Sequence, residues 1–83
     1  MRTPLVVGNW KMNAGRPAEA RELAQAGRDG LKRPRGVEIG LCPPATALAA
    51  VAEVLAGSPV LLGAQTCHWE DSGAFTGEVS PPM

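Results

Sequence analysis

Three short apolar segments most constrain the fold of this 83-residue chain. They are residues 4–10 (PLVVGNW), 37–43 (VEIGLCP) and 59–65 (PVLLGAQ), and in each an apolar run leads to a glycine and then to a loop. Apolar runs without alternation are typical of strands buried on both faces, as in parallel sheets. The sequence therefore predicts three parallel strands.

The segment after the first strand has the periodicity of a helix. Pro17 suits the first helical turn, and Gly30 or the region 34–36 is expected to end the helix. Its apolar stripe follows helical spacing: Ala20, Leu23, Ala24, Gly27 and Leu31.

A second helix is predicted within residues 44–59, where Gly57 fits a C-terminal cap and Pro59 blocks continuation. Its predicted stripe is Leu48, Val51, Ala52 and Leu55. The order of elements is then β-α-β-α-β, followed by a long loop from about Thr66. This order predicts an α/β fold with right-handed crossovers between parallel strands.

Three parallel strands form neither a closed barrel nor a complete open sheet, and they leave two open edges. Near the end of the sequence, Ser80 suits a helix N-cap and Pro81 a first helical turn, which predicts a further helix. We therefore expect residues 1–83 to be the N-terminal part of one larger α/β domain.

Charge argues against a nucleic-acid or membrane-surface partner recognised through bulk charge, since eight Lys and Arg balance eight Asp and Glu. All eight bases and three acids lie in residues 1–35, and the other five acids lie in residues 36–83. A basic nucleic-acid arm is the weaker explanation, because the bases are scattered along a helical pattern. The stronger one is a solvated helix, together with acids whose partners lie outside this chain.

Cysteine usage and hydropathy bear on the compartment. Cys42 and Cys67 fit neither a metal spacing nor a disulfide framework. No apolar stretch is long enough to span a bilayer, and the N-terminus lacks the apolar core of a signal peptide. The sequence therefore predicts a reduced, cytoplasmic protein.

Asn9 and Lys11 follow the first strand, and strand periodicity predicts that they lie on the same side. Ligands of parallel α/β folds bind at the carboxyl ends of the strands. There a lysine can stabilise a phosphate or a developing oxyanion, and an asparagine can orient a carbonyl. The alternative is a lysine extending to solvent beside an asparagine that turns the chain.

Other chemistry has weaker support. Neither a Walker A motif nor a Gly-x-Gly-x-x-Gly motif is present, which disfavours nucleotide binding. Cys67 and His68 lie beside Glu70 and Asp71, but adjacent side chains in an extended loop diverge, so no metal site is expected. Trp10 and Trp69 are expected to be packing residues.

Two motifs resemble triosephosphate isomerases. VGNWKMN is similar to the first strand and loop of that family, and GAQTCHWEDSGAFTGEVSPPM to its third strand and loop, while CPP after the second strand agrees. The resemblance covers the whole chain but only about the first third of a barrel of roughly 250 residues. It implies a (β/α)8 TIM barrel, truncated here after the third strand and loop.

The resemblance also implies an activity: interconversion of dihydroxyacetone phosphate and glyceraldehyde 3-phosphate in glycolysis and gluconeogenesis, through an enediol(ate) and without a cofactor. Asn9 and Lys11 match the substrate-binding pair, with Lys11 in an electrostatic catalytic role. Trp10 belongs to the same substrate-binding segment and is expected to support it. The glutamate base and histidine electrophile of the family lie beyond this chain, and neither His68 nor Glu78 replaces them.

This chain alone is therefore expected to be inactive. Two alternatives remain: a truncated remnant with a structural or subunit-association role, and an unrelated open α/β phosphate-binding domain.

A homodimer is the last implication. In the family the third loop enters the twin subunit, and the match of Thr76 reaches that subunit's copies of Asn9 and Lys11. The residues matching the dimer interface are Met12, Gln65, Phe75, Thr76, Gly77 and Glu78. Some of Glu70, Asp71 and Glu78 are expected to pair with bases outside this chain.

Overall fold

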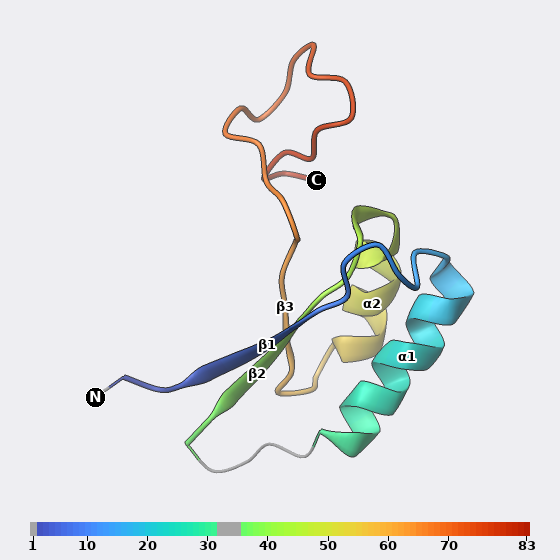
Figure 1. Cartoon of the computed structure of the whole chain (residues 1–83), viewed down its shortest axis with the longest axis vertical. Helices are drawn as coiled ribbons and strands as arrows, with labels where there is room; N and C mark the ends of the chain where they lie inside the picture. Colours follow the sequence, from blue (N-terminus) through green and yellow to red (C-terminus); the bar gives the residue numbers. More distant parts are fainter. Residues whose placement is uncertain (1, 32–35) are drawn as a thin grey trace.

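The computed structural model describes residues 2–31 and 36–83 and contains the predicted β-α-β-α-β order (Figure 1). A short 3-10 turn, Ala45–Ala47, precedes the second helix. The elements are β1 (Leu5–Asn9), α1 (Pro17–Gly30), β2 (Glu38–Cys42), α2 (Leu48–Leu55) and β3 (Leu61–Leu62).

The three strands form one parallel sheet in the order β1-β2-β3. Asn9 pairs with Cys42 at the carboxyl end of β1, and Leu41 pairs with Leu62 in β3. β3 is two residues long, much shorter than the predicted segment 59–65. Further backbone hydrogen bonds hold the chain beyond the strand ends, from Trp10 N–H to Cys42 O (3.0 Å) and from Gly63 N–H to Leu41 O (2.9 Å).

α1 begins at Pro17, as predicted, and ends at Gly30; the alternative end in 34–36 involves Pro34, which lies outside the described residues. Only part of the predicted stripe is buried. Ala20 and Ala24 are fully buried, whereas Leu23 is 48% exposed and lines an open groove beside Trp10. The small alanines allow close contact with α2, and no described element covers the side of α1 that carries Leu23.

α2 buries Val51 and Leu55 of the predicted stripe, but not Ala52. Ala52 is exposed and Ala50 is buried, because Ala47 in the preceding 3-10 turn packs into the core and sets the phase. Gly57 has the positive φ expected of it (77°), but in a type II turn rather than a helix cap. In that turn Ala56 has φ −55° and ψ 129°, and Ser58 N–H donates to Leu55 O (2.9 Å).

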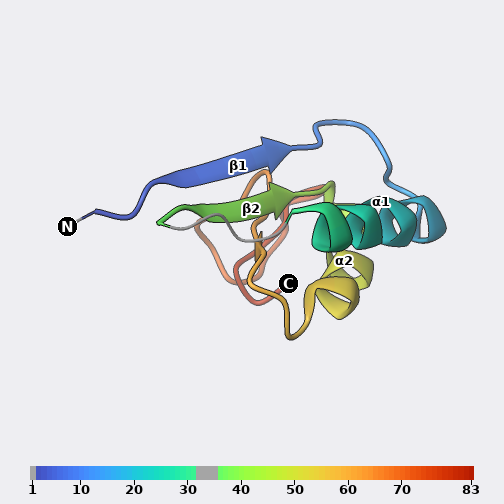
Figure 2. The same cartoon turned by 90° about the horizontal axis from the view of Figure 1, so that it is seen from below.

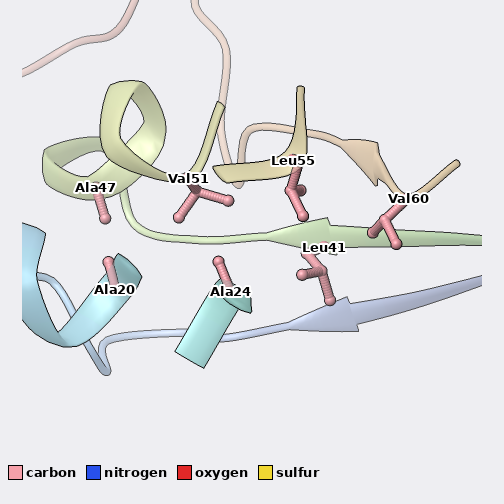
Figure 3. Close-up of a cluster of buried hydrophobic side chains, with 7 residues drawn as sticks. All are labelled: Ala20, Ala24, Leu41, Ala47, Val51, Leu55 and Val60. Atoms are coloured by element: carbon pink, nitrogen blue, oxygen red, sulfur yellow. The ribbon is translucent and has the colours of Figure 1, made fainter. Parts of the chain in front are cut away.

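One apolar cluster joins both helices to one face of the sheet (Figures 2 and 3). Its members come from α1, α2, the strands and their connections: Ala20, Ala24, Leu41, Ala47, Val51, Leu55 and Val60. Alanine fills the space between the helices, and Leu41 extends from β2 toward them. The cluster therefore fixes the layer order of helices on sheet.

The prediction that the strands are buried on both faces is wrong for β1 and β3 in this chain. Val6 is 60% exposed and Leu61 45% exposed, whereas Leu41 in the central strand is buried. Within residues 2–31 and 36–83, no second layer packs against the sheet face opposite the helices, so apolar side chains remain accessible there.

The side chain of Arg28 in α1 connects the two helices by hydrogen bonds to backbone carbonyls. Its Nη1 donates to Val54 O (2.7 Å) and to Ala56 O (3.0 Å), at the carboxyl end of α2. A second contact between the helices joins Arg21 and Glu53 at 3.7 Å, with both side chains more than half exposed. None of the helices in the described part of the chain has the length and apolarity to cross a membrane.

Candidate functional site

The loop after β1 lies at the carboxyl edge of the sheet, where ligands bind in parallel α/β folds. Asn9 is the last residue of β1, so strand alternation does not extend to Lys11. Instead, Lys11 has a left-handed backbone (φ 55°), and its N–H donates to Asn9 Oδ1 over 2.8 Å. The structure therefore brings the two residues together through a side chain-to-backbone hydrogen bond.

The same loop has further internal support. Trp10 is partly buried and packs against the core, which agrees with its predicted packing role. Asn13 Nδ2 donates to Trp10 O (2.9 Å). Ala14 also has a positive φ (54°), and Thr46 Oγ1 donates to the next carbonyl, Gly15 O (2.8 Å). The two left-handed residues thus lie in a loop with several fixed peptide groups.

Gln65 follows β3 and contacts the ends of the other two strands. Its Nε2 lies 2.8 Å from Lys11 O and 2.9 Å from Cys42 O. The sequence identified Gln65 only through the resemblance, as an interface residue, and contained no signal for these two hydrogen bonds. They join residues separated by 54 and 23 positions, which a local pattern cannot reveal.

A cavity of about 250 Å³ opens beside this loop. Lys11, Met12 and Gln65 line it, together with Gly77 and Val79 of the third loop. The structure thus brings three of the predicted interface residues, Met12, Gln65 and Gly77, to the same cavity as Lys11. Phe75, Thr76 and Glu78 do not line it.

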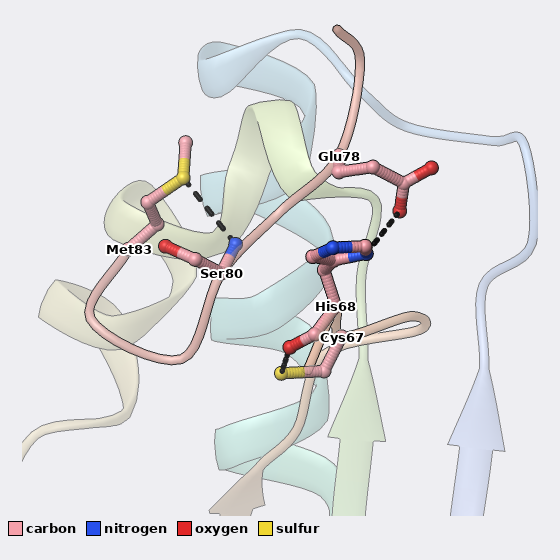
Figure 4. A network of polar contacts seen from close by, with 5 residues as sticks. All are labelled: Cys67, His68, Glu78, Ser80 and Met83. Atoms are coloured by element: carbon pink, nitrogen blue, oxygen red, sulfur yellow. Dashed lines mark hydrogen bonds and ion pairs between the residues drawn. The ribbon is translucent and has the colours of Figure 1, made fainter. Parts of the chain in front are cut away.

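The third loop is closed at its base by His68 N–H, which donates to Val79 O (2.7 Å). The His68 ring is buried, and it stacks on Trp69 and lies tilted against Phe75, with centroid separations of 4.2 and 4.3 Å. Its Nδ1 is 3.7 Å from Glu78 Oε2 (Figure 4), whereas its Nε2 has no hydrogen-bond partner among the described residues. Trp69 remains 83% exposed, which disagrees with the packing role predicted for it.

The expected pairing of some of Glu70, Asp71 and Glu78 with bases outside this chain stays a prediction. Glu78 faces His68, and Glu70 and Asp71 form no ion pair within residues 2–31 and 36–83. In the described part of the chain, no group of three or more His, Cys, Asp or Glu side chains could hold a metal ion. Ser80 and Met83 form a turn, with Met83 N–H donating to Ser80 O (3.1 Å), and the helix start at Ser80 and Pro81 stays a prediction.

Fold and site together define a class of protein. Both helices cover the same sheet face, as in a barrel, whereas a doubly wound sheet carries helices on both faces. A loop with a lysine at the carboxyl edge is where barrel enzymes place functional groups. The chain therefore has the architecture of part of a (β/α)8 barrel.

Comparison with known proteins specifies the family. The family model described as triosephosphate isomerase matches residues 4–83. The triosephosphate isomerases of Carboxydothermus hydrogenoformans and Chloroflexus aurantiacus are 51% and 53% identical to the chain, over all of it and 33% of their own length. The chain belongs to the triosephosphate isomerase family. It spans about a third of the length of the curated relatives that it matches.

A solved structure agrees with this assignment. The crystal structure of triosephosphate isomerase from Bartonella henselae superposes with a TM-score of 0.75 at 36% sequence identity. The match covers 94% of this chain and 31% of that one. The truncated (β/α)8 barrel predicted from the sequence is thereby confirmed.

Proposed function

We propose that residues 1–83 are the N-terminal part of a triosephosphate isomerase and supply the electrostatic side of its substrate site. The observation that carries this proposal is the geometry of Lys11. Its backbone is held by Asn9 and Gln65 at the carboxyl edge of the sheet, beside a cavity that Lys11 lines. The substrate is a small phosphorylated triose, and no cofactor takes part.

The chemistry follows from charge. Isomerisation of a triose phosphate removes a proton next to a carbonyl, forms an enediol(ate) and returns the proton to the neighbouring carbon. The Lys11 ammonium favours the substrate phosphate and stabilises negative charge that develops on the carbonyl oxygen. The amide of Asn9 orients substrate oxygens, and Trp10 supports the loop between them.

The proton-transfer groups are supplied by the remainder of the barrel. The chain's one histidine, His68, does not line the cavity of Lys11, and its Nδ1 faces Glu78. The 83-residue chain alone is therefore inactive.

The full-length protein is a cytoplasmic homodimer in this proposal. Met12 and Phe75 are apolar yet 96% and 45% exposed, which suits residues buried by a second subunit. Gln65, Thr76, Gly77 and Glu78 complete that interface, with Thr76 reaching the other subunit's copy of the Asn9–Lys11 site. The free cysteines Cys42 and Cys67 suit a reducing compartment.

The test is a coupled isomerase assay on the full-length protein that contains these residues. Lys11→Ala should lower kcat/KM by at least about 100-fold, the loss typical of removing one oxyanion-stabilising group. The dimer should persist in sedimentation experiments. Arg16→Ala is the matched control, since Arg16 is an exposed base that does not line the cavity.

Two results would contradict the proposal. Retained activity in Lys11→Ala would refute the role of Lys11. Turnover by the purified 83-residue chain that disappears in Lys11→Ala would refute the view that this chain alone is inactive.

A further inference from the structure

Both polar backbone groups of Lys11 are held by side chains. Asn9 Oδ1 accepts its N–H (2.8 Å), and Gln65 Nε2 donates to its C=O (2.8 Å). Lys11 needs this support, because a residue with a Cβ is less stable in the left-handed region than in the right-handed one. The conformation persists where the surroundings over-determine it.

Gln65 also anchors this loop to the second strand. The same Nε2 donates to Cys42 O (2.9 Å), and that carbonyl accepts Trp10 N–H as well (3.0 Å). Cys42 O thus holds the chain just before Lys11 through Trp10, and just after it through Gln65. Lys11 lies between two connections to one fixed point at the end of β2.

We propose that Gln65 is a positioning residue for Lys11: it fixes the backbone from which the ammonium group reaches the substrate. This inference rests on the proposed function for its effect on catalysis, but not for the hydrogen bonds themselves. Both bonds lie within one chain, so the role is separate from any part that Gln65 has in a subunit interface.

The chemistry of the side chain explains why an amide stands here. Nε2 carries two hydrogens, and the two carbonyls use both. An ionised glutamate can only accept hydrogen bonds, and the side chains of leucine and methionine contain no hydrogen-bond donor. Each would leave Lys11 O and Cys42 O without this donor and release the left-handed residue.

The first experiment measures catalysis in the full-length protein. Gln65→Met keeps an unbranched side chain but removes both donated bonds, and it should lower kcat/KM about tenfold, the effect of losing one or two ordinary hydrogen bonds. In a Lys11→Ala background the same change should have no further effect, since Gln65 acts through Lys11. If Gln65 has a purely structural role, the reductions in kcat/KM caused by Gln65→Met and Lys11→Ala should be independent, and the double variant should show their product.

Gln25→Met is the matched control. Gln25 also donates a hydrogen bond from its side-chain amide, but only one, to Asp29 Oδ1 (3.0 Å) on the exposed side of α1. Its variant should retain wild-type kcat/KM. A Gln65→Met enzyme as active as wild type would overturn the proposal while leaving the isomerase function intact.

The second experiment does not depend on activity. Amide hydrogen exchange at Trp10 and Lys11 should be faster in Gln65→Met by about tenfold, while exchange at the buried Ala24 in α1 stays unchanged. The measurement is made at a protein concentration where the dimer persists. Unchanged exchange at Trp10 and Lys11 overturns the proposal whether or not the protein isomerises trioses, whereas an inactive wild-type protein overturns only the proposed function.

Discussion

The guanidinium of Arg28 lies 2.7 Å from the carbonyl oxygen of Val54, so a side chain of α1 caps the carboxyl end of α2. The last carbonyls of a helix have no partner within that helix, and a cation is favoured beside them. A second bond to Ala56 O makes the contact a two-point one. The alignment of the two helices thus depends on a polar clamp as well as on their small apolar residues.

Replacing Arg28 should weaken this clamp. Arg28→Met should lower the free energy of unfolding by about 1 kcal/mol, because charge-assisted bonds to two carbonyls are lost at an exposed site. Urea denaturation of the full-length protein measures the change. Arg21→Met, which removes only the exposed 3.7 Å contact to Glu53, should stay within about 0.5 kcal/mol of wild type. Equal effects of the two variants would contradict the clamp.

The Cys42 side chain leaves no room for a Cβ at Gly63. A Cβ at this position would lie 2.9 Å from Cys42 Sγ, closer than side-chain carbons approach. Gly63→Ala should therefore lower the free energy of unfolding by about 1–3 kcal/mol, and adding Cys42→Ala should restore most of it. Gly30→Ala is the control, because nothing lies within 4 Å of a Cβ there. A double variant as unstable as Gly63→Ala would disprove the steric explanation.

Ala14 offers a stabilising change. Its φ of 54° suits glycine better than alanine, so Ala14→Gly should raise the free energy of unfolding by about 0.5–1 kcal/mol. The opposite is expected at the exposed Ala26 within α1, where glycine should cost about 1 kcal/mol. Chemical denaturation of both variants compares them directly. Destabilisation by both would show that residue 14 is not left-handed in solution.

The ring contacts of buried His68 should contribute more to the free energy of unfolding than the hydrogen bonds of its nitrogens. Its Nε2 has no partner in the described structure, and its ring contacts Trp69 and Phe75. His68→Phe retains these contacts and should change the free energy of unfolding by less than about 1 kcal/mol, whereas His68→Ala should lower it by about 2–3 kcal/mol. If both variants lower the free energy of unfolding equally, the interaction of Nδ1 with Glu78 contributes more to stability than the ring contacts.

The purified 83-residue chain should not unfold cooperatively. Val6, Val7 and Leu61 expose 60%, 46% and 45% of their surface, so much of the apolar area of the sheet contributes little to folding. Circular dichroism during heating should show a gradual change in a monomeric sample. A sharp sigmoidal transition would contradict this expectation.

Local patterns explain what the sequence predicted well. Pro17 suits the first turn of a helix, and the glycines after the apolar runs mark where strands end and loops begin. The element order followed from these signals, whereas the barrel class followed only from the resemblance of two motifs to triosephosphate isomerases. The position of Asn9 at the end of its strand followed as well, since both the apolar run and the glycine precede it.

Long-range packing explains what the sequence did not predict. Ala50 rather than Ala52 is buried because the 3-10 turn at Ala45–Ala47 sets the phase of α2. No helical period distinguishes the two alanines in advance. Likewise, the link from Gln65 to Lys11 depends on three strands ending at one edge, so it becomes visible only in the assembled sheet.

The loop that carries Lys11 is held by one side chain from each of three successive segments: Asn9 in β1, Thr46 before α2 and Gln65 after β3. These contacts lie entirely within residues 9–65. Exchanging this segment as a unit between related barrels should therefore carry the shape of the loop with it, whereas exchanging the loop alone would separate it from two of its three supports. In this part of the barrel, the smallest segment that keeps the conformation of the Lys11 loop therefore includes all three strands.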